Sequence, residues 1–169
     1  MQANYFIEHL KNCAETIRSL TTGVPDEQAR WKPDAESWSI LEVVNHLYDE
    51  ERLDFRVRVD YLLNHPDEDF PPIDPRGWVT EREYNRRDLE ESVRNFLAER
   101  EKSLAWLRTL VQPDWEVARK THFGEIKAGD IFVAWGAHDL LHTRQLVELH
   151  WAWTVREARP FDVRYAGDW

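Results

Sequence analysis

The chain has 169 residues, long enough for one complete hydrophobic core, and its single cysteine excludes an internal disulfide or a zinc site built from several thiolates. A formal net charge of −10, with no block rich in Lys or Arg, argues against binding to nucleic acid or to anionic membranes. Six glycines and few β-branched runs favour an all-α fold. No apolar run is long enough to span a membrane, and the N-terminus lacks the apolar core of a signal peptide, so we expect a cytoplasmic protein.

The first predicted helix covers about residues 3–22. Its apolar residues recur at alternating spacings of four and three, which is typical of a helix in a bundle: Phe6, Leu10, Cys13, Ile17 and Leu20. Cys13 is therefore expected in the core rather than as a reactive thiol. His9 lies beside this stripe and is expected to face solvent. The segment that follows contains glycine and two prolines, and we expect a loop with at most one short helical turn.

The second predicted helix begins at Ser39 and continues to about Asn64. Ser39 and Glu42 have the spacing of a capping box, in which each residue bonds the other's backbone N–H. A broad apolar face follows, with His46 at its edge and Glu50 one turn later. Pro66 then ends the helix.

The proline-rich segment 65–78 is the longest predicted loop, and its length suggests a crossover between non-adjacent helices or a lid. Thr80 and Glu83 have the spacing to cap a first turn, and the third helix runs from Leu89 to about residue 111. Residues 114–130 are expected to form a loop or a small hairpin. Neither half of the chain would keep a complete helical core, so we predict a single domain over residues 1–169.

The fourth predicted helix starts at Asp130, as its cap, and runs to about Arg156. One narrow stripe of it carries polar residues among apolar ones: Ile131, Trp135, His138, His142, Gln145 and Leu149. Two imidazoles thus lie where leucines are expected, and burying them costs free energy unless each finds a partner. A metal ion would satisfy both, because side chains four residues apart are neighbours on a helix.

The opposite side of this helix is also apolar, at Val133, Leu140, Val147 and Trp151. A helix that is apolar on two faces is either central or covered by something else. The cover is expected to be the C-terminal tail, packing through Phe161, Tyr165 and Trp169, or a second subunit. We therefore expect a homodimer.

The candidate metal site combines His46 with His138 and His142. Three neutral imidazoles from two helices, with further positions open, are typical of a catalytic zinc site, and nickel, cobalt or iron also accept such ligands. Glu50 could act as a fourth ligand, as an acceptor beyond the ligands, or as a catalytic proton acceptor. Trp135 is the predicted pocket wall. The alternative is that these are core histidines satisfied by the protein itself.

Two segments resemble the DinB-like (DinB/YfiT) superfamily. WSILEVVNHLYDEE, residues 38–51, is similar to the family's pattern on its second helix, and AWGAHDLLHTRQ, residues 134–145, to that on its fourth. The terminal YAGDW resembles a recurring Gly-Pro-Trp ending, with Asp168 in place of the proline. The resemblance implies a four-helix bundle in up-down-down-up order with a long crossover between helices two and three, a divalent metal on the three histidines, and homodimers. Members with assigned activity include transferases and isomerases that use thiols such as bacillithiol or mycothiol.

Two functions remain open from the sequence. The first is a metal-dependent, low-molecular-weight-thiol-dependent transferase, in which zinc or nickel lowers the pKa of a bound thiol; metal-dependent hydrolysis is a variant of it. The second is a non-enzymatic protein, related to stress, that binds a metal or a small molecule. In both, the partner is a small molecule.

Overall fold

Four long helical segments form the body of the protein. The computed structural model of the chain describes residues 2–121 and 124–167. The bundle segments are α1 (Ala3–Thr21), α3 (Ile40–Glu50) continued by η1 (Glu51–Phe55) and α4 (Arg56–Asn64), α6 (Leu89–Thr109), and α7 (Ala128–Glu157). The shorter elements are α2 (Asp26–Arg30), α5 (Pro75–Glu81), η2 (Tyr84–Arg86), β1 (Ala118–Thr121), β2 (Gly124–Lys127) and η3 (Arg164–Ala166).

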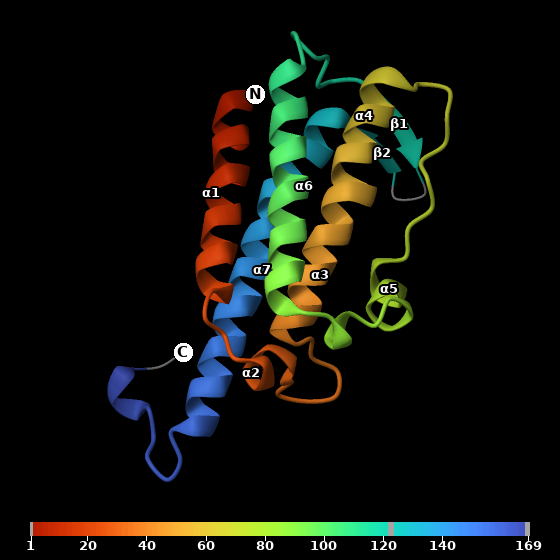
Figure 1. Cartoon of the computed structure of the whole chain (residues 1–169). Helices are drawn as coiled ribbons and strands as arrows, with labels where there is room; N and C mark the ends of the chain where they lie inside the picture. Colours follow the sequence, from red (N-terminus) through yellow and green to blue (C-terminus); the bar gives the residue numbers. More distant parts are fainter. Residues whose placement is uncertain (1, 122–123, 168–169) are drawn as a thin grey trace.

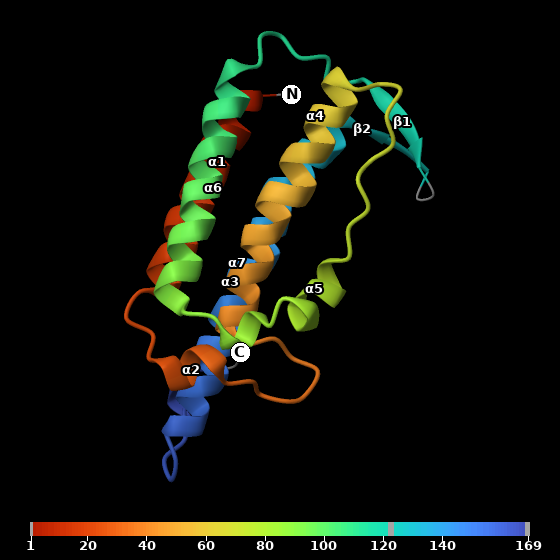
Figure 2. The same cartoon turned by 45° about the vertical axis from the view of Figure 1, so that its right-hand side comes forward.

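The chain runs down α1, up α3–α4, up α6 and down α7 (Figure 1). Helix α7 packs against α1 and α4, and α6 packs against α1 and α3. Because α4 and α6 point the same way, residues 65–88 must return along the length of the bundle between them (Figure 2). The all-α four-helix bundle with a long crossover is thus confirmed, and β1 and β2 pair antiparallel.

An ion-pair cluster at one end and hydrogen bonds from an arginine at the other fasten the crossover. At its lower end the carboxylate of Asp49 on α3, fully buried, accepts hydrogen bonds from the Arg82 guanidinium and the Tyr84 hydroxyl, both at 2.5 Å. At its upper end the guanidinium of Arg119 on β1 donates to the backbone carbonyls of His65, Pro66 and Glu68. Bonds to charged groups each stabilise a fold more than neutral ones, so the crossover is held at both ends.

The second predicted helix is continuous in direction but contains a π-helical turn, η1. A π turn inserts one extra residue and rotates the rest of the helix relative to what precedes it. The residues that point inward are Leu47, Glu51, Phe55 and Val59, at three successive spacings of four. In an uninterrupted α-helix of 3.6 residues per turn such a stripe would drift out of the core. The π turn corrects the drift and keeps Phe55 against α7.

The core of the bundle lies in two buried clusters, one at each end, and a smaller third cluster holds Trp78, Val79 and Tyr84 of the crossover. The lower one contains Ile17, Val44 and Leu146, and the upper one contains Leu10, Val59 and Phe132. Cys13 is buried as expected, and burial raises the pKa of its thiol to about 11, which disfavours the reactive thiolate.

Helix starts differ from the predictions at two places. The capping box of Ser39 and Glu42 is present. The expected cap at Thr80 and Glu83 is wrong: Asp74 caps α5, and Glu83 adopts a left-handed backbone with φ of 50°. Helix α7 begins two residues before Asp130, whose carboxylate lies in the first turn and accepts from the Lys127 backbone N–H at 3.0 Å.

His9 is half-buried rather than directed to solvent. Its ring lies over Gly136 of α7, where a Cβ would come within 2.8 Å of the imidazole, and its Nε2 is 3.6 Å from the Cys13 Sγ. The missing side chain at Gly136 therefore creates the space that His9 fills between α1 and α7. No periodicity within α1 alone can reveal this, because the space belongs to the other helix.

The tail does not pack on the body as predicted: Phe161 is 81% exposed and Tyr165 is fully exposed. Trp169 lies outside the described residues. On the second face of α7, Leu140 is 52% exposed, while Val133, Val147 and Trp151 are half-buried. The described tail residues do not cover Leu140, and the homodimer stays a prediction.

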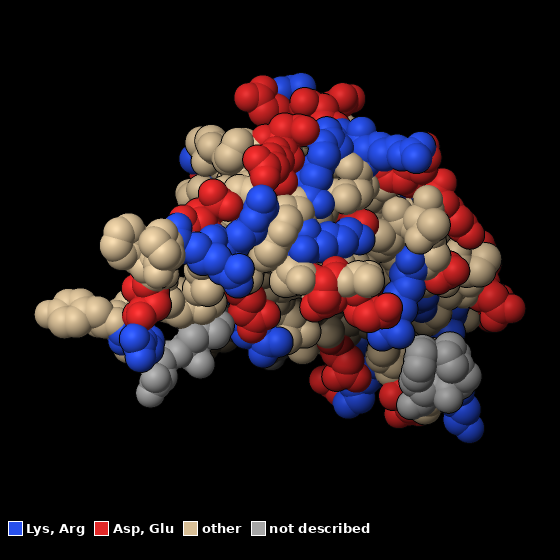
Figure 3. Space-filling model, turned by 90° about the horizontal axis from the view of Figure 1, so that it is seen from below, with Lys and Arg blue, Asp and Glu red and all other residues tan. Residues whose placement is uncertain are grey.

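The surface mixes charges of both signs. Seen from below, Lys and Arg side chains alternate with Asp and Glu side chains (Figure 3). Within residues 2–121 and 124–167, no helix combines the length and apolar character needed to cross a bilayer.

Candidate metal centre

Three imidazoles converge between α3 and α7. The Nε2 atom of His138 lies 3.3 Å from the Nε2 of His46 and 3.1 Å from the Nε2 of His142. Nitrogen ligands about 2.0–2.1 Å from one ion lie about 2.8–3.4 Å apart in octahedral or tetrahedral arrangement. The three nitrogens thus have the spacing of ligands to a single ion, which fits a divalent metal.

The helices themselves bring these rings together. His138 and His142 are one turn apart on α7, while His46 is on α3, which packs directly against α7. In the described part of the chain, these three residues form the one group of His, Cys, Asp or Glu side chains arranged to hold an ion. The structure therefore brings together the three histidines that the sequence singled out.

The three rings are uncharged at neutral pH. Burial, together with the neighbouring rings, lowers the pKa of His46 to about 2. Burial and the charge of Arg100 act in the same direction on His138, lowering its pKa to about 3, and burial lowers the pKa of His142. Metal ligation requires neutral imidazole with a free lone pair, so the protein holds these rings in the state that binds.

Gln145 fixes the tautomer of His142. The Nδ1–H of His142 donates to the Gln145 side-chain oxygen at 2.8 Å, which leaves the Nε2 lone pair free. The Nδ1 of His46 is buried and has no hydrogen-bond partner among the described residues. A buried nitrogen without a partner costs free energy, and a strong bond at the other nitrogen of the same ring offsets that cost.

Aromatic rings enclose the cluster. Trp38 stacks on His142 with centroids 6.2 Å apart and contacts His46 at 4.8 Å. From the π turn, Phe55 contacts His138 at 5.0 Å. The histidine cluster therefore lies in a largely apolar surrounding, in which the charge of a bound ion acts strongly on its ligands.

Glu50 lies one turn beyond His46 and is 5% exposed. It is not part of the ion-holding group, so the structure gives no support for Glu50 as a fourth ligand. One carboxyl oxygen, Oε1, is buried and has no hydrogen-bond partner in the described chain. Burial, then the charge and hydrogen bond of Asp54, raise the pKa of Glu50 to about 8. Its role in catalysis stays a prediction.

Trp135 is 1% exposed and stacks on Phe55, with ring centroids 5.8 Å apart. Its indole N–H donates to the Glu51 carboxylate at 2.9 Å. The side chain thus reaches the histidine cluster through Phe55 rather than by its own contact, and its assignment as a pocket wall stays a prediction.

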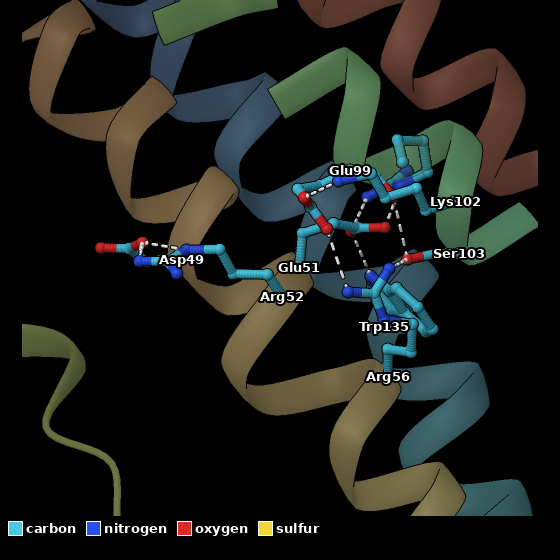
Figure 4. Close-up of polar contacts among 9 residues, drawn as sticks. Asp49, Glu51, Arg52, Arg56, Glu99, Lys102, Ser103 and Trp135 are labelled. Carbon is cyan, nitrogen blue, oxygen red and sulfur yellow. Dashed lines mark hydrogen bonds and ion pairs between the residues drawn. The ribbon is translucent and has the colours of Figure 1, made fainter. Parts of the chain in front are cut away.

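A second polar cluster adjoins the first. The guanidinium of Arg100 on α6 donates to both oxygens of Glu51 and both oxygens of Asp139, at 2.6–3.0 Å, and all three side chains are 1% exposed. Figure 4 shows Glu51 directed towards Trp135, with Asp49 on the other side of the helix. Asp139 follows His138 directly, so this cluster fixes the turn of α7 that carries a histidine.

The periodicity of α6 alone does not identify Arg100 as part of this cluster. Arg100 occupies a position in the apolar stripe of α6, between Phe96 and Leu104, where an unpaired charge cannot be buried. A charged residue in an apolar stripe therefore indicates that a buried acidic partner lies opposite. Its partners could not be named, because Glu51 enters the core only through the π turn.

The comparisons agree with this architecture. A family model described as the DinB superfamily matches residues 9–146. Among solved structures, the fold is similar to YfiT from Bacillus subtilis, described as "a probable metal-dependent hydrolase with an unusual four-helix bundle topology". The identity is 18%, the TM-score is 0.78, and the match covers 93% of this chain and 88% of that one. No curated protein matches the chain at a significant level. Since the family model covers most of the sequence, this chain belongs to the DinB superfamily.

Proposed function

We propose that the protein is a metal-dependent enzyme whose divalent ion is held by His46, His138 and His142. The observation that carries the proposal is the convergence of three uncharged Nε2 atoms at 3.1 and 3.3 Å. Bound there, a divalent ion would act as a Lewis acid and lower the pKa of a small nucleophile. Zinc and nickel both accept three imidazoles, and either fits these ligands.

The residues around the ligands have separate tasks in this proposal. Gln145 holds His142 in the ligating tautomer through the 2.8 Å hydrogen bond. Trp38 and Phe55 exclude water from the sides of the cluster that they cover. Glu50, buried one turn from His46, moves a proton to or from the nucleophile.

The proposed reaction is transfer of a low-molecular-weight thiol to an electrophile. This form rests on the two sequence segments that resemble the superfamily, whose characterised members include enzymes that use such thiols. Hydrolysis is the second candidate, because the structurally similar YfiT is described as a probable hydrolase. Both reactions need the same ligands and differ only in the nucleophile. A non-enzymatic metal-binding protein is the third outcome.

The test begins with the metal. Protein purified without a histidine tag is expected to contain about one divalent ion per chain, and His138→Ala to contain none. The matched control is His65→Ala, which removes a half-exposed histidine at the end of α4. Absence of metal uptake by the unaltered protein would refute the proposal.

The reaction is tested next on the metal-loaded protein. Consumption of a small thiol together with a model electrophile, faster than in His138→Ala, supports transfer. Cleavage of ester or amide substrates without thiol supports hydrolysis. If the metal binds but neither rate exceeds that of His138→Ala, the enzyme proposal is wrong and the protein is a metal-binding protein.

A further inference from the structure

A pair of carboxyl groups lies on the helix that carries His46. Glu50, at the end of α3, is only 5% exposed. Asp54, in the π turn, has a side chain that is 13% exposed. A side-chain hydrogen bond joins the two carboxyl groups. Two carboxylates cannot both be ionised at hydrogen-bond distance, so this contact requires that the pair hold one proton.

The surroundings determine where that proton lies. Asp54 forms an ion pair with Arg58, one turn further along. Glu50 has no such cation, and burial is the largest effect on it. Glu50 is therefore the protonated member and donates its proton to Asp54. The other charges that act on Glu50 are those of Asp49, which is itself paired with Arg82, and Arg58.

The other carboxyl oxygen of Glu50, Oε1, does not take part in the hydrogen bond with Asp54. Oε1 is buried and accepts no hydrogen bond from any described residue. A buried carbonyl-type oxygen without a donor is costly, and such atoms in functional sites often face a ligand. Glu50 is one turn from His46 on the same helix, so its carboxyl group starts one helical turn from a ligand of the histidine cluster.

Glu50, Asp54 and Arg58 lie progressively closer to the surface. The exposed fraction of the side chain rises from Glu50 to Asp54, at 13%, and to Arg58, at 25%. Arg58 also lies over the Phe70 ring of the crossover, with its guanidinium carbon 4.8 Å from the ring centroid. The carboxyl pair thus connects a buried oxygen near the candidate metal centre to the region under the crossover.

We infer that Glu50 and Asp54 form a proton relay for the reaction at the histidine cluster. Oε1 of Glu50 takes the proton of the nucleophile while the proton on the other oxygen of Glu50 passes to Asp54. One O–H bond forms at Oε1 of Glu50 as the O–H bond at its other oxygen breaks, so Glu50 stays neutral. The proton that leaves Glu50 ends on Asp54. In the reverse direction the relay returns this proton to the leaving group. Glu50 is the catalytic residue, and Asp54 acts through it as a positioning residue and proton acceptor.

This inference rests on the proposed function for its reaction, but the shared proton can be tested without activity. In metal-free protein, infrared difference spectra between about pH 6 and about pH 10 are expected to show the C=O band of a protonated carboxyl group that disappears near the pKa of Glu50. The band should be absent in Glu50→Gln. In Asp54→Asn it should disappear at lower pH, because the negative neighbour is gone. No such band, or one that persists in Glu50→Gln, would overturn the relay even if metal-dependent activity exists.

Kinetics provide the second readout once a substrate is found. Glu50→Gln and Asp54→Asn are each expected to lower kcat by about 100-fold or more with KM and metal affinity unchanged. The double variant should be no slower than either single variant, because the two groups act as a unit. Asp60→Asn, on the same helix and paired with His65 near the surface, is the control and should keep full activity. Losses that simply multiply in the double variant, or an Asp54→Asn with normal kcat, would contradict the relay.

Discussion

Two polar clusters lie side by side in the core, and they differ in how their polar atoms are satisfied. In the ionic cluster, the guanidinium of Arg100 donates hydrogen bonds to both oxygens of Glu51 and both oxygens of Asp139. The protein itself therefore provides partners for all three charged groups. In the histidine cluster, three ring nitrogens face one another, and the Nδ1 of His46 has no partner in the described chain. The ionic cluster is complete within the protein, and the histidine cluster is not.

This difference separates a structural role from a functional one. The Nε2 atoms of the three histidines lie 3.1 and 3.3 Å apart, the spacing of ligands to one ion, so a metal would complete this cluster. Neighbouring residues of one helix serve the two clusters, because Asp139 directly follows His138 on α7. The same turn of helix therefore holds the scaffold on one side and the candidate site on the other.

Breaking the ionic cluster is expected to have the largest effect. Arg100→Met leaves Glu51 and Asp139 buried without a cation, and we expect a loss of about 3–5 kcal/mol in the free energy of unfolding, measured with urea. The comparison is Arg56→Met, which removes a partly exposed partner of Glu99 and should cost much less.

Replacing all three residues of the ionic cluster tests whether the loss of stability comes from unpaired buried charge. In the triple variant Glu51→Leu, Arg100→Met and Asp139→Leu, no buried charge is left unpaired, and most of the lost stability should return. The Trp135 indole loses its acceptor, so recovery is expected to be incomplete. A triple variant less stable than Arg100→Met alone would show that the cost lies in packing rather than charge.

Completing the histidine cluster should stabilise the protein. Zinc at about 100 times its dissociation constant is expected to add about 2.7 kcal/mol to the free energy of unfolding. His138→Ala should abolish this gain, whereas His65→Ala should retain it. Thermal denaturation of metal-free protein with and without added zinc provides the measurement, and an equal shift in His138→Ala would contradict the assignment of the ligand.

Loosening one ligand should have a smaller effect. Gln145→Leu removes the acceptor of the His142 Nδ1–H, and metal affinity is expected to fall about 10–100-fold by calorimetric titration. Gln145→Glu keeps an acceptor at this position and should retain or raise the affinity. If both variants bind like the unaltered protein, Gln145 does not orient His142.

How much of this could be read from the sequence differs between the two clusters. His138 and His142 share one helix stripe, so their spacing alone predicts that they are neighbours, and Ser39 with Glu42 correctly locates the start of the helix that carries His46. The ionic cluster depends on Glu51 entering the core, which requires the π turn. The available signal was the repeated spacing of four from Leu47 to Val59, which no straight α-helix accommodates.

Errors at the periphery have a different cause. The aromatic residues of the tail suggested packing, but nothing in a local pattern shows whether the body offers a surface for Phe161 and Tyr165. The position of His9 over Gly136 likewise depends on two helices that are far apart in the chain. Local periodicity predicts which face of a helix is apolar, and it does not predict what lies opposite.

The last expected effect is a pH dependence that comes from Glu50. Its pKa is raised from 4.5 to about 8 in the folded protein, so between these values the folded state holds a proton that the unfolded state has released. The contribution of Glu50 to stability is therefore complete below about pH 4.5 and is lost as the pH rises towards about 8, by about 1.4 kcal/mol per pH unit. Above the ordinary histidine pKa of 6.5 the buried imidazoles add nothing, since they are neutral in both states.

Glu50→Gln removes this dependence. Urea unfolding of metal-free protein between about pH 6.5 and about pH 8 should show stability falling with pH in the unaltered chain and a flatter profile in the variant. The variant should also be the more stable of the two near pH 8, because an amide needs no proton to remain uncharged. Glu101→Gln, an exposed substitution on α6, is the control and should keep the slope of the unaltered chain. A variant that lost activity and also lost stability at every pH would identify Glu50 as part of the scaffold, whereas lost activity with gained stability marks a residue retained for its chemistry.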